Sequence, residues 1–494
     1  MRSTALPQSS PTSDLSRLQG PAIGRPALDQ ITWMPTIVEE LRALATDLKE
    51  SVGEGRHEST TRALVLIGDG GGKVALAKAF TAELGVEYHE ISGHRIAAAP
   101  IAEQCIAELL KPIMTREGAE GEKLTQVIHF RDTHLLFEPR GEDSQHYLPR
   151  PAFHAVVAAI EDLVAKSTGR PFIVVSADFD SAALPPTIFT ASDHIIDVRR
   201  PSSVPERLMA ISQFVTTLQS DSIAAPSKKE LDYFARMTAG LSSEELKQLV
   251  EGAFSIARRT KAESLTLAHL VERFERQGRG IANQSGPGDE DQSRIEKHED
   301  GHGIVADFCG VRPLLISSAS RGRTGGCVLP DPSALGERFH TKGQGLKSML
   351  ICLGGLAAER KLLGDLEVSE GSMRDLQQLR STVQRMVAAG FFIDELSGAR
   401  SEGSMPGGHS ELIWKLIRGA RSTAERLVEL AGKDTFQKAD ETRRSAGGTI
   451  FGEGAENFYR AIVPASKYAD AEKLIKRFLS NPFAEVGSGS TRAD

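Results

Sequence analysis

The sequence feature that most constrains this chain is a pair of histidines near its middle, within the pattern H-E-D-G-H at residues 298–302. On a helix, His298 and His302 share a face, so both imidazoles can reach one cation, and Glu299 faces the same cavity. Zinc held by three protein groups keeps a position open for water and lowers the pKa of that water. Glu299 would take the proton and pass it to a leaving amine. The pattern predicts a zinc peptidase; two solvated histidines on a surface helix are the alternative.

A zinc site of this kind needs a third ligand, and Asp375 further along the chain offers a carboxylate. The segments H-E-D-G-H-G-I-V-A, L-G-G-L-A-A-E and G-S-M-R-D-L-Q-Q follow one another in the order and spacing that resembles the M41 peptidase domain of the FtsH family. The resemblance implies that His298, His302 and Asp375 are the zinc ligands and that Glu299 is the base. A charge at a helix N-terminus is the alternative role for Asp375.

Composition describes an ordinary protein of two to four domains, with 494 residues, 40% hydrophobic and 25% charged residues and a net charge of -7. Without a basic surplus, and with only 5% aromatic residues, we expect no nucleic-acid partner. Four scattered cysteines indicate reduced thiols and a cytoplasmic location. No stretch approaches the ~20 apolar residues that span a bilayer, so we expect a soluble protein without a transmembrane segment. This departs from the usual membrane-anchored FtsH plan.

A second constellation lies in the N-terminal half, where residues 63–80 read A-L-V-L-I-G-D-G-G-G-K-V-A-L-A-K-A-F. A buried strand, a glycine loop and a helix in this order are the outline of a phosphate-binding loop. Gly70, Gly72 and Lys73 are its candidate nucleotide-binding residues. With the sequence that follows, this segment resembles the start of the AAA ATPase module that precedes the peptidase in FtsH.

The departures from that module affect its chemistry. The loop is one residue shorter than G-x-x-x-x-G-K-[ST], and Val74 stands where a hydroxyl would hold magnesium. Arg131 occupies the place of the metal-associated acid and Asp132 that of the catalytic glutamate. Asp178 stands where a sensor asparagine is expected. We therefore expect little or no ATPase activity; nucleotide binding through Lys73 without hydrolysis, and a plain strand-to-helix turn, both remain open.

The predicted fold class is an α/β AAA-like domain, with a parallel sheet, flanking helices and a helical lid, followed by a mainly α-helical zinc peptidase domain. The predicted division is 1–30 disordered, 31–204 AAA-like α/β subdomain, 205–280 helical lid, 281–293 linker, 294–485 M41-like peptidase domain and 486–494 disordered tail. Residues 311–330 suggest one or two short strands with a glycine turn. The stretch 432–454 matches nothing that could be placed.

These patterns predict a zinc-dependent metalloendopeptidase that hydrolyses unfolded or flexible proteins without ATP-driven unfolding. Zn²⁺ is the expected cofactor, and the sequence leaves open whether ATP binds. A homo-oligomeric, hexameric ring is implied by the family resemblance alone. The alternatives are an ATP-dependent AAA protease whose divergent nucleotide site still works, and a non-catalytic ring that binds or regulates partners. His340 lies in a glycine-rich loop and is interpreted as a solvated histidine rather than a ligand.

Overall fold

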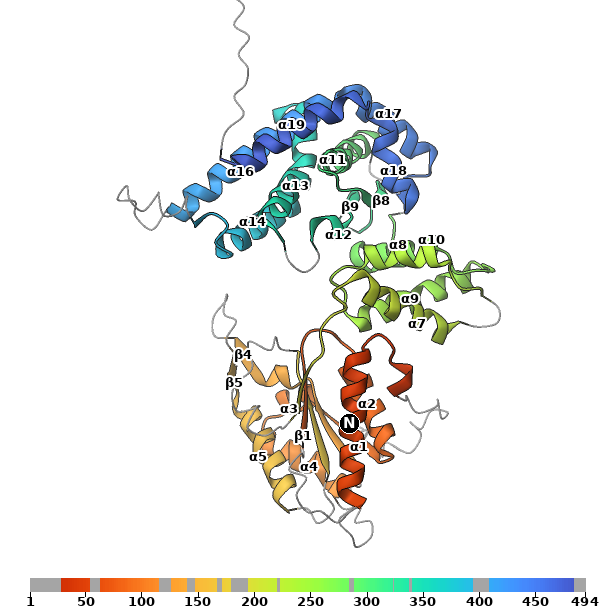
Figure 1. Ribbon diagram of the computed structural model, residues 1–494, viewed down its shortest axis with the longest axis vertical. Helices are drawn as coiled ribbons and strands as arrows, with labels where there is room; N and C mark the ends of the chain where they lie inside the picture. Colours follow the sequence, from red (N-terminus) through yellow and green to blue (C-terminus); the bar gives the residue numbers. More distant parts are fainter. Residues whose placement is uncertain are drawn as a thin grey trace, which may run out of the picture. The chain divides into compact units, whose positions relative to one another are not determined.

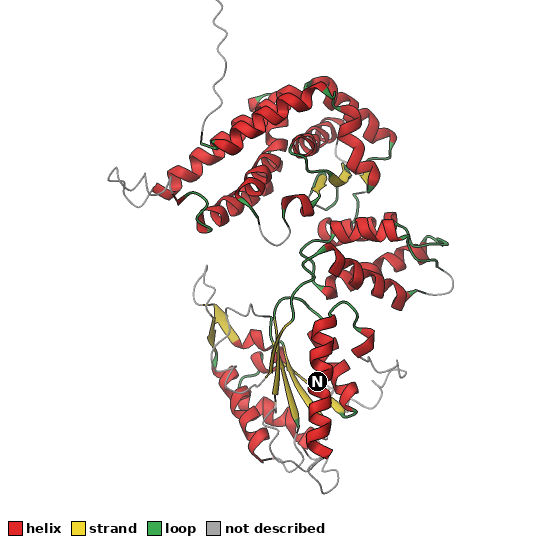
Figure 2. Cartoon of the chain, in the orientation of Figure 1, coloured by secondary structure: helices red, strands yellow, loops and turns green. Residues whose placement is uncertain are grey.

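The computed structural model describes residues 28–53, 63–114, 126–139, 147–166, 171–178, 194–219, 223–283, 288–322, 324–336, 340–393 and 408–483. The chain divides into two compact units, Met1–Arg200 and Pro201–Asp494. The first unit holds an α/β sheet, and the second is mainly helical with a few short strands (Figure 2). The predicted fold class is therefore confirmed.

Five parallel strands form the sheet of the first unit, in the order β2-β3-β6-β1-β7. The central strands are short runs of buried apolar residues, which is the pattern of a parallel sheet covered on both faces. The strands are β1 (Ala63–Ile67), β2 (Glu87–Ser92), β3 (Gln126–Arg131), β6 (Phe172–Ser176) and β7 (His194–Asp197). A small hairpin is formed by β4 (Phe137–Pro139) and β5 (Tyr147–Pro149).

Helices cover both faces of this sheet, because alternate residues of each strand point to opposite sides. On β1, Leu64 and Leu66 pack with α1 (Pro35–Gly53) and α2 (Lys73–Leu84). Val65 and Ile67 pack with α4 (Ala102–Met114) and α5 (Pro151–Lys166) on the other face. The smaller elements are η2 (Leu28–Gln30), α3 (Gly93–Ala97) and η3 (Thr133–Leu136). Figure 1 shows the three layers.

The second unit begins with four helices in the region predicted as the lid: α7 (Val204–Leu218), α8 (Lys228–Met237), α9 (Ser243–Arg259) and α10 (Leu267–Arg279). Three of them start with a serine whose side chain accepts a hydrogen bond from the backbone of a glutamate three residues later. Arg321, which is nearly fully buried, joins these helices to the following domain through ion pairs of 2.6 Å to Glu272 and 3.0 Å to Glu275. The lid and the following domain thus form one compact unit.

The rest of the second unit is a helical domain around a small antiparallel sheet of order β10-β8-β9. The elements are α11 (Asp289–Phe308), β8 (Pro313–Ser317), β9 (Cys327–Pro330), α12 (Pro332–Leu335), α13 (Lys342–Leu362), η5 (Asp365–Glu367), η6 (Glu370–Ser372), α14 (Met373–Ala388), α16 (Gly408–Ala431), α17 (Lys433–Ser445), β10 (Thr449–Phe451), α18 (Glu453–Ile462) and α19 (Ser466–Ser480). β8 and β9 lie where the sequence predicted one or two strands, and the unplaced stretch 432–454 supplies α17 and β10.

Two boundaries differ from those expected. Residues 289–293, predicted as part of a linker, form the first turn of α11, whose acidic start suits a helix N-terminus. Leu28–Gln30, predicted as disordered, form η2 because Leu28 is fully buried. Residues 1–27 and 486–494 lie outside the described residues. Within the described part of the chain, none of the helices has the length and apolar character needed to cross a membrane.

Candidate active site

Two helices that touch backbone to backbone form the floor of the candidate site. A Cβ atom on Gly301 of α11 would lie 2.3 Å from the carbonyl oxygen of Gly354 on α13, and one on Gly354 would lie 2.4 Å from that of Gly301. Only glycine at both positions allows this approach. It brings the residues of α13 that follow Gly354 against the histidine face of α11.

The three predicted ligand residues meet on this floor. Nε2 of His298 and Nε2 of His302 are 3.0 Å apart. Oδ2 of Asp375, from the first turn of α14, lies 3.1 Å from Nε2 of His298 and 3.3 Å from Nε2 of His302. Among the described residues these three form the group of His, Cys, Asp or Glu side chains whose atoms converge closely enough to hold a metal ion. The structure thus places together the three residues that the sequence predicted as ligands.

The donor set fits zinc. Two imidazole nitrogens and one carboxylate oxygen form a ligand set of catalytic zinc, and Zn–N bonds of about 2.0–2.1 Å place tetrahedral ligands about 3.3–3.4 Å apart. The observed separations lie within a few tenths of an ångström of that value. A Cβ atom on Gly355 would lie 2.5 Å from Nε2 of His298 and 2.6 Å from Nε2 of His302. The absence of a side chain at Gly355 leaves the space in front of the ligand atoms clear.

The second nitrogen of each histidine has its own partner. Nδ1 of His298 lies 2.6 Å from Oε1 of Glu359, a buried carboxylate on α13. Nδ1 of His302 lies 2.7 Å from the carbonyl oxygen of Ile351. Because these oxygens accept a hydrogen bond, they favour the tautomers in which Nδ1 carries the proton and Nε2 is free to bind a metal.

The hydrogen bonds between His298, His302 and Asp375 favour the ionised form of Asp375. Burial disfavours a charged His298, but its hydrogen bonds to Asp375 and Glu359 outweigh this and raise its pKa to about 10. Burial also opposes ionisation of Asp375, yet the hydrogen bonds from the two histidines hold its pKa well below the usual range. Asp375 is therefore an anion that attracts a cation to this position. A metal ion would have to displace the proton from His298.

Glu299 lies beside the ligands in a closely packed corner. A Cβ atom on Gly326, just before β9, would lie 2.4 Å from Cγ of Glu299 and 2.8 Å from the carbonyl oxygen of Ser317. Burial raises the pKa of Glu299, against the nearby charges of His298 and His302. A carboxylate whose pKa is raised is a better proton acceptor, which is what a general base requires.

Sequence reasoning missed two residues of this site, Gly355 and Glu359. Both belong to the segment L-G-G-L-A-A-E, which contributed to the resemblance to the M41 peptidase domain but was assigned no chemical role. Their spacing of four on a helix, with an acidic residue among apolar ones, was the available signal. His340, interpreted as a loop histidine, is exposed and donates from Nδ1 to the carbonyl oxygen of Leu335 at 2.8 Å. It is not part of the converging group.

The glycine loop in the first unit has internal partners for its candidate nucleotide-binding residues. Nζ of Lys73 is buried, donates to the carbonyl oxygen of Gly68 at 2.5 Å and pairs with Asp178 at 2.6 Å. The backbone N–H of Gly70 donates to the carbonyl oxygen of Val198 at 2.8 Å. Gly72 precedes α2 in the left-handed conformation, which glycine adopts readily. In this arrangement Lys73 and Gly70 already use the groups that would contact phosphate.

The neighbouring end of β3 is basic where a nucleotide-hydrolysing site would be acidic. Arg131 pairs with Glu90 at 2.6 Å and with Asp132 at 2.7 Å. Glu90 and Asp132 neutralise the charge of Arg131, and their carboxylates are occupied by these ion pairs. The sequence of residues 188–196, where an arginine finger would be expected, contains no arginine, and most of this segment lies outside the described residues.

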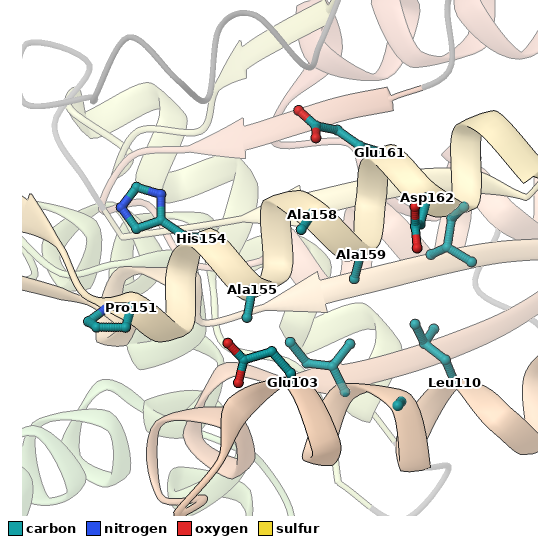
Figure 3. A pocket seen from close by; sticks show the side chains of 12 residues that line it. Glu103, Leu110, Pro151, His154, Ala155, Ala158, Ala159, Glu161 and Asp162 are labelled. Atoms are coloured by element: carbon teal, nitrogen blue, oxygen red, sulfur yellow. The ribbon is translucent and has the colours of Figure 1, made fainter.

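A hollow of about 860 Å³ lies between α4 and α5 of the first unit (Figure 3). Alanine side chains of α5 form much of its wall, and Glu103, His154 and Asp162 stand at its rim. It contains none of the residues predicted to bind metal or nucleotide.

Comparison with known proteins points to one family. Residues 288–403 match the model of peptidase family M41. The ATP-dependent zinc metalloprotease FtsH 3 of Sphaerobacter thermophilus is 27% identical over 354 residues, which cover 71% of this chain and 69% of that protein. FtsH 3 of a Synechocystis species is 24% identical over 333 residues, covering 66% of this chain and 51% of that protein. A solved structure of the Thermotoga maritima RuvB Holliday junction branch migration motor aligns with 55% of this chain and 77% of its own, at 18% identity and a TM-score of 0.38.

Proposed function

We propose, from the match of residues 288–403 to peptidase family M41 and the similarity to FtsH proteases, that this chain is a zinc-dependent endopeptidase acting on unfolded or flexible proteins without ATP-driven unfolding. The observation that carries the proposal is the convergence of His298, His302 and Asp375 beside Glu299. We assign the first three as zinc ligands and Glu299 as the general base.

Each residue has a distinct part in peptide hydrolysis. When bound, zinc acts as a Lewis acid that lowers the pKa of water and polarises a carbonyl group. Glu299 takes a proton from water and returns it to the amine that leaves, for which its burial and raised pKa are suited. Glu359 and the carbonyl group of Ile351 keep the two imidazoles in the required tautomers.

The glycine loop supports the proposal that ATP is not used. To bind phosphate, Lys73 would have to leave Asp178 and the carbonyl oxygen of Gly68, and both acceptors would lose a charge-assisted hydrogen bond. The contact with phosphate would have to compensate for the loss of these two bonds. Val74 has no oxygen for magnesium, and Arg131 occupies the place of the metal-associated acid and engages the nearby carboxylates of Glu90 and Asp132 in ion pairs. Substrates must then reach the zinc site as extended or flexible segments.

We also propose a homo-oligomeric ring and a cytoplasmic location. The ring rests only on the resemblance to FtsH, and sedimentation equilibrium of the purified chain tests it. The location is supported by the four cysteines, Cys105, Cys309, Cys327 and Cys352, which are all free thiols. Fractionation of cells followed by immunoblotting tests it.

The test of the function is casein hydrolysis by purified full-length protein, with and without ATP, for wild type and Glu299→Gln, with bound zinc quantified in both. We expect cleavage by wild type in either condition and about one zinc ion per site in both proteins. Glu299→Gln keeps the shape and zinc but lacks the base, so its rate should fall by at least about 10²-fold.

Other outcomes would favour the rival functions. Cleavage that requires ATP and is lost in Lys73→Ala would show that the divergent nucleotide site works. Zinc binding without any cleavage would favour a non-catalytic ring. Unchanged cleavage by Glu299→Gln would contradict the proposed mechanism.

A further inference from the structure

The catalytic helix α11 carries a buried charge on the side opposite its metal ligands. At about 100° per residue, Asp300 projects about 200° around the helix from His298, and Glu296 projects from the same back face. Asp300 is fully buried, so its carboxylate has left water for the protein interior. A buried carboxylate is costly unless it is paired and hydrogen bonded.

The partners of Asp300 come from the stretch to which the sequence gave no role and from the helix that follows it. Nη2 of Arg443, on α17, lies 2.5 Å from Oδ2 of Asp300, and both side chains are fully buried. The hydroxyl of Tyr459, on α18, donates to Oδ1 of Asp300 at 2.9 Å. Both α17 and α18 contact α11, and Figure 1 shows the three helices together.

Two further contacts hold the same face of α11. Nη2 of Arg444 donates to Oε2 of buried Glu296 at 2.9 Å. The ring of Tyr459 presses on Gly303, where a Cβ atom would lie 2.1 Å from the ring. Charge pairing and steric contact therefore act on one side of the helix and resist its rotation.

The same stretch also reaches the strand beside Glu299. β10 pairs with β8, with Thr449 opposite Ser317, and the N–H of Ser318 donates to the carbonyl oxygen of Gly448 at 3.0 Å. Gly448 in turn donates to the carbonyl oxygen of Arg443 at 3.0 Å. One segment thus holds both the helix that bears the ligands and the strand that borders the base.

Stability alone is a poor reason for this arrangement. In the described part of the structure, Nε and Nη1 of buried Arg443 have no hydrogen-bond partner. A buried ion pair with unsatisfied donors contributes little to folding, and well-packed apolar residues of similar volume often replace such pairs without loss of stability. The geometry instead fixes the orientation of one helix.

We propose that Arg443 and Tyr459 are positioning residues of the peptidase: acting through Asp300, they set the rotation of α11 so that His298, His302 and Glu299 converge at the metal. The proposal rests on the function proposed above. It also gives the stretch 432–454 a role, which is to hold α11 by the face opposite the metal ligands.

The main test removes both charges at once, in the double variant Asp300→Leu with Arg443→Met, and compares it with wild type as full-length protein. Three quantities are measured: kcat and KM for a quenched peptide, the zinc dissociation constant by chelator competition, and the thermal midpoint of the metal-free protein. We expect the thermal midpoint and KM to be unchanged. We expect kcat to fall by about 10- to 100-fold and the zinc dissociation constant to rise by about 10- to 100-fold.

Tyr459→Phe is the milder variant, because it keeps the ring against Gly303 and removes only the hydroxyl that binds Asp300. We expect a smaller fall in kcat and an altered visible absorption spectrum of the cobalt-substituted protein. Tyr468→Phe is the matched control, since Tyr468 donates to Asp307 further along the same helix. It should leave both quantities unchanged.

The outcomes separate the two proposals. If wild type cleaves nothing, the function fails, but zinc affinity and the cobalt spectrum still test the positioning role. A double variant with the kcat, zinc affinity and thermal midpoint of wild type would overturn the positioning role. So would equal effects of Tyr459→Phe and Tyr468→Phe. A double variant that does not fold leaves Tyr459→Phe to decide by the same spectrum.

Discussion

A Cβ atom built on Gly355 would lie 2.5 Å from Nε2 of His298, in the space in front of the ligand atoms. Gly355→Ala should therefore block metal binding without changing any ligand. We expect zinc content near zero and loss of casein cleavage, measured by atomic absorption and by the release of labelled peptides. Gly343→Ala on the same helix is the control, because its Cβ would meet only Oγ1 of Thr341 at 4.0 Å. Normal zinc content in Gly355→Ala would contradict this geometry.

Glu359→Ala removes the carboxylate that accepts the hydrogen bond from Nδ1 of His298. Loss of such a partner leaves the imidazole free to rotate and to change tautomer, so zinc should bind about 10- to 100-fold more weakly. Glu359→Gln retains an acceptor oxygen and should lose less. Chelator competition measures both. The control is Glu429→Ala. It removes only the exposed carboxylate that pairs with Lys361, which lies on α13 as Glu359 does, and this variant should bind zinc as wild type does.

ATP should not stabilise this protein. Because Lys73 and Gly70 already have internal partners, we expect no shift in thermal midpoint on addition of ATP and magnesium, where a bound ligand would raise it. Lys73→Met should cleave casein at the wild-type rate. A midpoint that rises with ATP in wild type, but not in Lys73→Met, would show that the internal ion pair with Asp178 opens for nucleotide.

Acid should destabilise the first unit through His129. This side chain is fully buried in the sheet, between the hydroxyls of Tyr88 and Ser176. Burial, aided by the charges of Arg131 and Lys78, lowers its pKa from 6.5 to about 3. In the unfolded chain His129 takes up a proton near pH 6.5, while in the folded protein it stays neutral to about pH 3. The stability that it contributes is therefore present above pH 6.5 and is lost as the pH falls towards 3.

The slope from this single group reaches about 1.4 kcal/mol per pH unit within that window. His129→Gln does not titrate, so its free energy of unfolding should depend less on pH between 6.5 and 3. Urea unfolding of the full chain at a series of pH values measures the difference. Identical slopes for wild type and His129→Gln would show that His129 is already protonated in the folded state.

Local patterns were enough to predict the fold class and the strand-loop-helix around Lys73. The resemblance to the M41 peptidase domain agrees with the family model that matches residues 288–403. His298, Glu299 and His302 are close in sequence, and helical geometry alone brings them together. Asp375 was assigned by resemblance, and its approach to the histidines agrees with that assignment. The roles of these four residues remain predictions until zinc and activity are measured.

Long-range contacts set the limit of prediction. The local sequence marks Glu359 as an acidic residue among apolar ones but does not identify His298 as its partner. Nor does it identify Arg443 as the partner of Asp300, since each pair forms only when separate helices pack. The sequence shows a glycine at position 355, but it does not show that this glycine leaves space for the ligand atoms, because that depends on how α13 crosses α11. The start of α11 at Asp289 was missed because a run of acidic and polar residues resembles a linker as much as a helix N-terminus.

The contact between Asp300 and Arg443 also sets an order of events during synthesis. The chain emerges from the ribosome with the catalytic helix before α17 and α18, so Asp300 waits without its partners until Arg443 and Tyr459 have been made. A nascent chain that carries the two histidines and even Asp375 still lacks the residues that fix their orientation. The orientation of α11 can therefore be fixed only after the chain has been made as far as Tyr459.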